Sequence, residues 1–457
     1  MYGDPAVTRE KPKGLLKSIQ DIRREELPLV LLMSGYFFLI ISTFWILKPI
    51  KKSLFVGFYR TQGFELLGMQ LKGSQAELLA KVLNMAVAYL AVVAFSLLAR
   101  RLRRQQITFA CSGFFVASFL AYAALIGIRH PAVVWSFYLF GDLYSTLMVA
   151  TFFAFLNDSF APDAARRVYG LVVLGGVAGG VFGAGTLRAF VSALDNRAWL
   201  GVCLVITLVV AALAALAGRI VDRNPPDAAE PEPQKPAEAK PPGNPALEGA
   251  KLVLRSRYLL SVVAIVGLYE IVSTIMDFQF TATLEHFANR GEIVFKEHLA
   301  TVSLVTNVSS LLAQVFLTGF IMTRFRLTVA LLLLPVAAVT GSVAFLALPL
   351  LWIGSLLNTV DNSLSYSINQ SSKEALYTVT SRAEKYQAKA FIDMFVQRFA
   401  KAIAVGVSLA VTVAFSDFST LRWLGLVTAA VVVAWVLAAR YAGRRFHELA
   451  DARSASE

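Results

Sequence analysis

The chain has 457 residues, of which 57% are hydrophobic and only 16% are charged, and its formal net charge is +13. Soluble proteins carry about a quarter of their residues as Asp, Glu, Lys and Arg. This composition, with a mean hydropathy of +0.62, therefore excludes a soluble protein and predicts an integral membrane protein. The excess positive charge is typical of basic loops on one side of a membrane. The lipid bilayer is an expected partner, and nucleic acid is not.

Twelve apolar segments of the sequence are long enough to cross a bilayer, for which about 20 residues suffice. They are expected near residues 28–50, 76–99, 107–128, 132–156, 168–190, 199–218, 258–282, 299–322, 327–346, 348–371, 389–414 and 421–441. The first 26 residues are polar and the first apolar segment has full spanning length, so a cleavable signal peptide is not expected.

A segment rich in Pro, Ala and Glu separates the sixth and seventh apolar segments. It cannot bury enough apolar surface to fold and is expected to be a flexible linker. The sequence thus predicts an all-α membrane protein with about 12 transmembrane helices in two six-helix bundles, a major-facilitator-like architecture. The predicted parts are a tail at 1–27, a bundle at 28–222, the linker at 223–250, a second bundle at 251–441 and a tail at 442–457.

Basic residues are concentrated in alternate loops, and by the positive-inside rule the linker and both termini are expected in the cytoplasm. The two halves also show a weak internal repeat. Asp142 precedes Arg166 by the same separation as Asp361 precedes Lys385, in the fourth segment of each half. Internal repeats of this kind are common in transporters.

Three lysines follow the first apolar segment, where a membrane helix normally carries no charge. Lys48, Lys51 and Lys52 would share one face of a continuing helix, given about 100° of rotation per residue. Lysine at membrane depth is costly and usually faces a bundle interior, a water-filled cavity or an anion. The three ammonium groups could also extend to water at the membrane surface. The preferred interpretation is a carrier whose cavity receives a multiply charged anion.

Further charges lie within apolar segments. The basic ones are Lys81 and Lys401, and the acidic ones are Asp142, Glu270, Asp277 and Asp361. Asp393, Gln397 and Lys401 recur every four residues and would form a polar stripe on one helix. Each residue alone could belong to a structural ion pair, but the whole set favours one central polar cavity. Lysine suits a polyphosphate because it is a compact charge with several donors.

The glycine-rich stretch from Gly175 to Gly185 is interpreted as a helix-packing surface. Gly175, Gly179 and Gly183 recur every four residues, which lets a neighbouring helix approach closely. A dinucleotide-binding loop would need a preceding strand. The sequence has no Walker motif, nucleophile elbow or metal-ligand spacing, so no enzyme activity, cofactor or metal is expected.

Three segments resemble a known family, the nucleotide transporters of plastids and obligate intracellular bacteria (the ATP/ADP translocase family, distinct from the mitochondrial carrier). In INQSSKEALYTVTSRAEKYQAKAFIDMFVQRFAKA the matching residues are Lys373, Glu374, Tyr377, Lys385, Lys389, Asp393, Arg398 and Lys401. WILKPIKKSLFV resembles the end of the family's first helix, with Lys48 and Lys51 on its basic positions. FLNDSFAPDAARRVYGLVVLGG matches the fourth-to-fifth connection through Asn157, Arg166 and Tyr169. Asp142 and Asp277 fall at or near the family's functional glutamates.

The sequence also departs from the family pattern. Lys52 replaces an acidic residue that follows the key lysine, and Thr281 stands where a lysine is expected. Val379 replaces a proline, and Phe399 with Ala400 replaces a glycine. The resemblance implies membership of the family, while the substrate could be another nucleotide or a different phosphorylated or lipidic anion.

The sequence therefore predicts a secondary transporter of a bacterial inner membrane. It would exchange a small phosphorylated anion, which the resemblance implies to be a nucleotide of the ATP/ADP type, by alternating access. The candidate substrate-binding residues are Lys48, Lys51, Lys52, Lys81, Asp142, Asp277, Lys373, Asp393, Arg398 and Lys401.

Two alternatives remain open. One is a proton-coupled transporter of another organic anion or a lipid, with Asp142, Asp361 and Asp393 as candidates for a proton relay. The other is a membrane scaffold or sensor that has a transporter fold and does not transport.

Overall fold

The computed structural model describes residues 25–66, 68–102, 104–160, 162–223, 245–380, 388–414 and 417–456. Most of these residues are helical, because in a bilayer every backbone N–H and C=O group must find its partner within the protein. Among the described residues, eleven helices are long and apolar enough to cross a membrane. The predicted all-α, multi-pass membrane protein is confirmed.

The first half of the chain forms six long helices and one β-hairpin. They are α2 (Leu27–Gln62), β1 (Phe64–Leu66), β2 (Met69–Leu71), α3 (Gly73–Arg101), α4 (Arg104–Leu125), α5 (Pro131–Ser159), α6 (Pro162–Phe190) and α7 (Asn196–Arg223). The chain leaves α2 through Gly63, whose φ of +69° suits glycine. Because α2 extends well beyond the predicted span at 28–50, Lys51 and Lys52, which follow that span, lie within the same helix as Lys48.

The second half contains more and shorter elements. They are α8 (Pro245–Arg255), α9 (Arg257–Asn289), α10 (Phe295–Leu312), η1 (Ala313–Thr318), α11 (Gly319–Arg324), α12 (Leu327–Ala347), α13 (Leu351–Leu364), η2 (Ser365–Asn369), α14 (Gln370–Leu376), η3 (Tyr377–Val379), α15 (Lys389–Phe391), η5 (Ile392–Val396), α16 (Gln397–Ala414), η6 (Phe418–Arg422) and α17 (Trp423–Ser456). Of these, η1, η2 and η5 are π-helical. The span predicted at 348–371 corresponds to α13, η2 and α14, which follow one another without a break.

Residues 224–244 of the predicted linker lie outside the described residues, and its end from Pro245 onward is the start of α8. The predicted tail at 442–457 continues α17 as far as Ser456. The reason is that Ala442, Phe446 and Leu449 recur at helical spacing and pack against the core of the second half.

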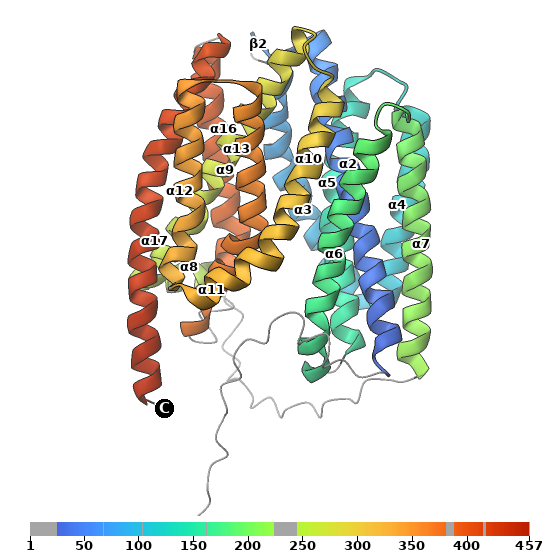
Figure 1. Cartoon of the computed structure of the whole chain (residues 1–457). Helices are drawn as coiled ribbons and strands as arrows, with labels where there is room; N and C mark the ends of the chain where they lie inside the picture. Colours follow the sequence, from blue (N-terminus) through green and yellow to red (C-terminus); the bar gives the residue numbers. More distant parts are fainter. Residues whose placement is uncertain are drawn as a thin grey trace, which may run out of the picture.

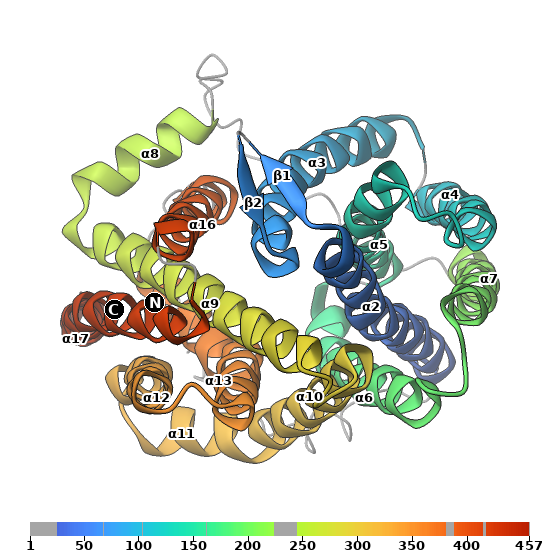
Figure 2. The same ribbon diagram turned by 90° about the horizontal axis from the view of Figure 1, so that it is seen from above.

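Each half has its own apolar core. One core is built almost wholly from residues of α2, α4, α5, α6 and α7, and another from residues of α8 to α17. Figure 2, viewed along the helices, shows α2–α7 on one side of the molecule and α8–α17 on the other. The halves meet where α10 packs on α2 and α6 and where α3 packs on α9 and α16.

The two ends of the molecule differ. We call the end with the β1–β2 hairpin the hairpin side, and the end where α7 stops and α8 starts the linker side (Figure 1). The helices of the two halves lie close together at the hairpin side and diverge toward the linker side (Figure 1).

The glycines of α6 bring this helix into backbone contact with α2. A Cβ atom added at Gly179 would collide with the backbone of Phe38, and one at Gly183 with the backbone of Ser42. The Ser42 hydroxyl donates a hydrogen bond of 3.0 Å to the carbonyl oxygen of Gly179. The interpretation of this stretch as a helix-packing surface is confirmed, since only glycine permits this approach.

Candidate functional site

A polar cavity of about 570 Å³ lies between the two halves. Its walls come from α2, α3 and α5 of the first half and from α9, α13, η2, α14 and α16 of the second. The charged residues on these walls are Lys48, Lys51, Lys52, Glu77, Lys81, Asp142, Glu270, Asp277, Lys373 and Lys401. The cavity therefore collects charges from helices that are far apart in the sequence.

Lys51 is buried in the first half and pairs with a carboxylate. Its ammonium group forms an ion pair with Asp142 of α5 and lies 4.4 Å from the ring centroid of Tyr138. The side chain of Lys51 passes so close to Gly141 that a Cβ atom there would meet it at 2.6 Å. Gly141 thus leaves room for the Lys51 side chain, and Asp142, the residue after Gly141, balances its charge.

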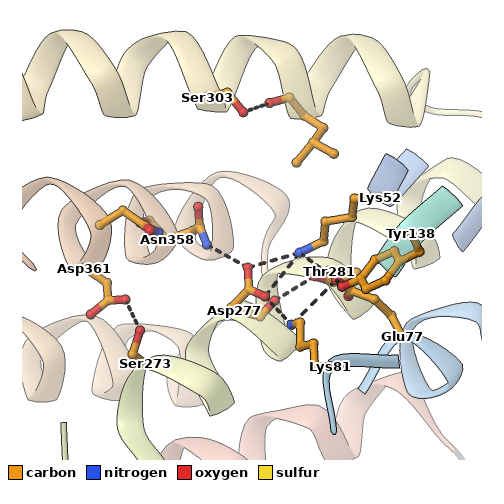
Figure 3. A network of polar contacts seen from close by, with 12 residues as sticks. Lys52, Glu77, Lys81, Tyr138, Ser273, Asp277, Thr281, Ser303, Asn358 and Asp361 are labelled. Atoms are coloured by element: carbon orange, nitrogen blue, oxygen red, sulfur yellow. Dashed lines mark hydrogen bonds and ion pairs between the residues drawn. The ribbon is translucent and has the colours of Figure 1, made fainter. Parts of the chain in front are cut away.

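A second ion-pair network connects the two halves (Figure 3). The ammonium of Lys52 lies 3.0 Å from the Asp277 carboxylate of α9 and 3.6 Å from Glu77 of α3. Lys81 also pairs with Asp277 and lies 3.6 Å from Glu77. Tyr138 donates a hydrogen bond of 2.9 Å to Glu77, so this buried carboxylate has a fixed position. Two lysines of the first half therefore hold one carboxylate of the second.

The lysines near the linker side have fewer partners. Lys401 lies 3.5 Å from the carboxylate of Glu270. Among the described residues, Lys48 and Lys373 have no carboxylate within ion-pair distance. Lys48 lies 4.7 Å from the ring centroid of Trp45, and Lys373 lies 5.1 Å from that of Tyr269. These two ammonium groups are available to a ligand without breaking an ion pair.

The overall balance of the cavity is positive. Six lysines face four carboxylates on its walls, an excess of two positive charges. Aromatic side chains of Phe44, Tyr138, Tyr269 and Tyr366 line the same cavity. A site with convergent ammonium groups and aromatic rings can bind a phosphorylated anion that carries a flat ring system.

Eight of the ten predicted binding residues line this cavity, and Asp393 and Arg398 do not. The carboxylate of Asp393 accepts a hydrogen bond of 3.2 Å from Gln397, and Arg398 donates one of 2.9 Å to the carbonyl oxygen of Met85. Gln397 and Lys401 of the predicted stripe line the cavity. Asp393, in the π-helical η5, contacts Gln397 but does not itself line the cavity.

Some residues of the sequence analysis have other positions. Asp361 is buried between α13 and α9, beside the cavity, and accepts a hydrogen bond of 2.6 Å from Ser273. Lys385 and the side chain of Arg166 lie outside the described residues. The sequence analysis missed Glu77, although an acid four residues before Lys81 in an apolar helix is a visible signal.

The comparisons with known proteins agree with this architecture. Residues 127–352 and 348–446 match the TLC ATP/ADP transporter family. The chain is 23% identical to an ADP,ATP carrier protein 1 of Chlamydia pneumoniae over 96% of its own length and 95% of the carrier's. It is 22% identical to a plastidic ATP/ADP-transporter of Solanum tuberosum, over 97% of this chain and 76% of that protein.

Solved structures show the same fold. The nucleoside transporter NupG aligns with a TM-score of 0.64 and 13% identity, over 91% of this chain and 99% of its own. The major facilitator superfamily transporter FucP, solved in an outward conformation, aligns with a TM-score of 0.52 and 14% identity, over 92% of this chain and 99% of its own. These likenesses confirm the major-facilitator-like fold. The family match covers well over half of the sequence, and the resemblance seen in three short segments is confirmed with it: the chain belongs to the TLC ATP/ADP transporter family.

Proposed function

We propose that this protein exchanges nucleotides of the ATP/ADP type across a membrane, and that the cavity between its halves binds the phosphates. The observation that carries the proposal is the set of six lysines, drawn from both halves, around one cavity of about 570 Å³. The relatives in Chlamydia and in plastids are ADP,ATP carriers by name, which supports a nucleotide as substrate.

The ion pairs suggest how binding and exchange are linked. Without a ligand, Asp142, Asp277 and Glu77 neutralise the buried lysines. A polyphosphate would replace these carboxylates, starting from Lys48 and Lys373, which have no acidic partner among the described residues. Unpaired charges are costly away from water. A returning anion lowers the cost of turning the carrier around, which favours exchange over one-way transport.

Alternating access requires the contacts between the halves to open at one side at a time. Lys52 and Lys81 of the first half hold Asp277 of the second, and Gln75 donates a hydrogen bond of 3.1 Å to Thr412. We place the division between two six-helix bundles in the chain between α7 and α8. The ligand that draws Lys52 away from Asp277 would loosen the hairpin side.

We also propose that the linker side is cytoplasmic and that the membrane is a bacterial inner membrane. Arg219 and Arg223 lie in the last two turns of α7, Arg324 ends α11, and Arg440 lies in the middle of α17. We assign all four to the linker side. Such clustering of arginine marks the cytoplasmic side of a membrane protein.

The test uses the purified protein in detergent and in liposomes. ATP or ADP at about 100 times its dissociation constant should stabilise the protein by about 2.7 kcal/mol, and internal ADP should drive uptake of external labelled ATP. Lys51→Gln should abolish both effects while the protein still folds, because the ligand loses a buried ammonium group. Lys251→Gln, on α8 outside the cavity, is the matched control. Wild-type exchange by Lys51→Gln would contradict the assigned role.

Asp361 favours a second candidate function, in which transport is coupled to protons. Its side chain is buried, and within the described residues Oδ1 has no hydrogen-bond partner and neither oxygen has a cation within ion-pair distance. The charged groups that face it are Glu270 and Asp277 of α9 and Lys48 of α2. A buried carboxyl in such surroundings is better accommodated with a proton than without one.

Asp361→Asn distinguishes the two candidates, because the amide imitates the protonated carboxyl and cannot release a proton. If transport is proton-coupled, an inside-alkaline pH gradient should accelerate uptake severalfold in the wild type and leave uptake by Asp361→Asn unchanged. Asp393→Asn, outside the cavity, should respond like the wild type. An absence of acceleration in the wild type would leave nucleotide exchange without a proton as the mechanism, and equal acceleration of both proteins would exclude Asp361 as the coupling group.

A further inference from the structure

A second cavity lies on the linker side, away from the central one. Its volume is about 840 Å³, and it is bordered by the junction of α8 and α9, by Val379 and Thr380, and by the last turns of α17. Four arginines line it: Arg255, Arg257, Arg444 and Arg445. Among the described residues on its walls, Glu448 is the one carboxylate. The α8–α9 junction and α17, which are far apart in the sequence, therefore place their arginines around one cavity.

The described residues do not balance the charge of this second cavity. Glu448 lies 2.5 Å from Arg445, three residues earlier on α17, and neutralises that arginine. Within the described part of the chain, Arg255, Arg257 and Arg444 have no carboxylate at ion-pair distance. Four guanidinium groups against one carboxylate leave an excess of three positive charges. Guanidinium groups arranged in this way bind phosphate oxygens, often in pairs.

Exposed apolar side chains lie on the same helices as the arginines of this cavity. Leu437 and Tyr441 of α17 are 62% and 44% exposed, and Arg444 and Arg445 follow on the same face of the helix toward the linker side. Leu254 of α8 is 72% exposed, and α8 lies at the rim of the molecule (Figure 2). A face that changes from apolar to cationic along a helix matches a phospholipid, with its acyl chain deeper than its headgroup.

We propose that this second cavity binds the phosphate headgroup of an anionic phospholipid at the linker-side surface of the membrane. Arg255, Arg257 and Arg444 hold the headgroup, and the acyl chain runs along Leu437 and Tyr441 of α17. Basic pockets between membrane helices at a cytoplasmic surface are suited to such headgroups. Basic residues on the cytoplasmic side can also serve only to orient the chain in the membrane. That role does not require the four arginines to line one cavity, as they do here. The proposal does not depend on what the central cavity transports.

The test measures lipid binding to the full chain after removal of co-purified lipid. Phosphatidylglycerol is titrated by native mass spectrometry, with phosphatidylcholine as the zwitterionic comparison and inorganic phosphate as the free-anion comparison. The triple variant Arg255→Gln/Arg257→Gln/Arg444→Gln should bind phosphatidylglycerol about a hundredfold more weakly, since each basic residue near an anionic surface contributes about a factor of five. The charge-matched control is Arg219→Gln/Arg324→Gln/Arg440→Gln, on the same side and outside the cavity. The affinity of this control for phosphatidylglycerol should stay within a few-fold of the wild-type affinity.

Three results would overturn the proposal: wild-type affinity in the triple variant, an equal loss in the charge-matched control, or displacement of phosphatidylglycerol by low millimolar inorganic phosphate. The last would identify a site for a free phosphate. If the triple variant does not fold, Arg444→Gln alone provides the test, with an expected loss of about fivefold.

Discussion

At the scale of single residues, two positions that differ from the pattern implied by the resemblance lie near one carboxylate. The resemblance implies an acid at the position of Lys52 and a lysine at that of Thr281. Thr281 lies one helical turn after Asp277, and its hydroxyl donates a hydrogen bond of 2.7 Å to the Asp277 carbonyl oxygen. Lys52 lies 3.0 Å from the Asp277 carboxylate. The cations near this carboxylate therefore come from the first half of the protein, from Lys52 and Lys81.

A double substitution tests whether Lys52 and Thr281 are coupled. Lys52→Asp alone should lower the free energy of unfolding by about 3 to 5 kcal/mol. The change removes a cation from a buried ion pair and places an acid beside Asp277 and Glu77. Adding Thr281→Lys should restore a large part of the loss. The measurement is the melting temperature of the four proteins of the cycle in detergent. Purely additive effects of the two changes would show that the positions are not coupled.

The sequence alone predicts the lysines of the cavity well, because a charge inside an apolar segment is too costly to face lipid and must find a polar interior. It does not show which carboxylate each lysine meets. The spacing of Glu77 and Lys81 predicts that these two side chains lie close together, but only the packing of α3 on α5 brings Glu77 to the hydroxyl of Tyr138. The aromatic residue Tyr366 likewise reaches the cavity from the π-helical η2, which is invisible in the pattern of hydropathy.

At the scale of elements, the contact between α2 and α6 depends on glycine. Gly179→Ala should destabilise the protein by about 1 to 3 kcal/mol, because the added methyl group would collide with the backbone of Phe38, which cannot rotate away. Gly170→Ala is the matched control on the same helix, where a Cβ atom meets nothing within 4 Å. It should be neutral or slightly stabilising. Thermal melting in detergent compares them, and equal effects would contradict the packing role of Gly179.

The start of α3 is held by a residue of the other half. The buried carboxylate of Glu285 in α9 accepts hydrogen bonds of 2.8 Å and 2.9 Å from the backbone N–H groups of Gly73 and Ser74. These N–H groups have no partner within the helix, and the carboxylate also complements the positive end of its dipole. This cap joins two helices that must separate if the hairpin side opens.

At the scale of the whole molecule, a cross-link at the hairpin side should stop transport. Ser192 donates a hydrogen bond of 2.8 Å to Glu297 of α10, across the two halves. A reducible cross-linker between Ser192→Cys and Glu297→Cys should abolish exchange in liposomes, and reduction should restore it. The native Cys111 and Cys203 are buried and should react little. The single-cysteine variants are the controls, and undiminished exchange by the cross-linked protein would exclude opening at this side.

The division into two halves and most of the spans could be predicted, because hydropathy reports the membrane directly. The interruptions of helices by π turns could not be predicted from hydropathy. The tenth span appears in the sequence as one apolar segment, whereas the protein divides it into α13, η2 and α14. The choice between α and π turns is made by contacts such as the one between η1 and η2, which no local pattern encodes.

The π-helical segments η1, η2 and η5 affect the side chains that reach the cavity. They lie in the second half, and the described helices of the first half contain no π turn. A π turn holds one residue more than an α turn, so the side chains beyond it point in a different direction from those of an uninterrupted α-helix. Segment η2 carries Tyr366, and η5 directly precedes the helix that carries Lys401. The cavity is thus lined on one side by described helices without π turns and on the other by helices that π turns interrupt, and such turns occur frequently at functional sites.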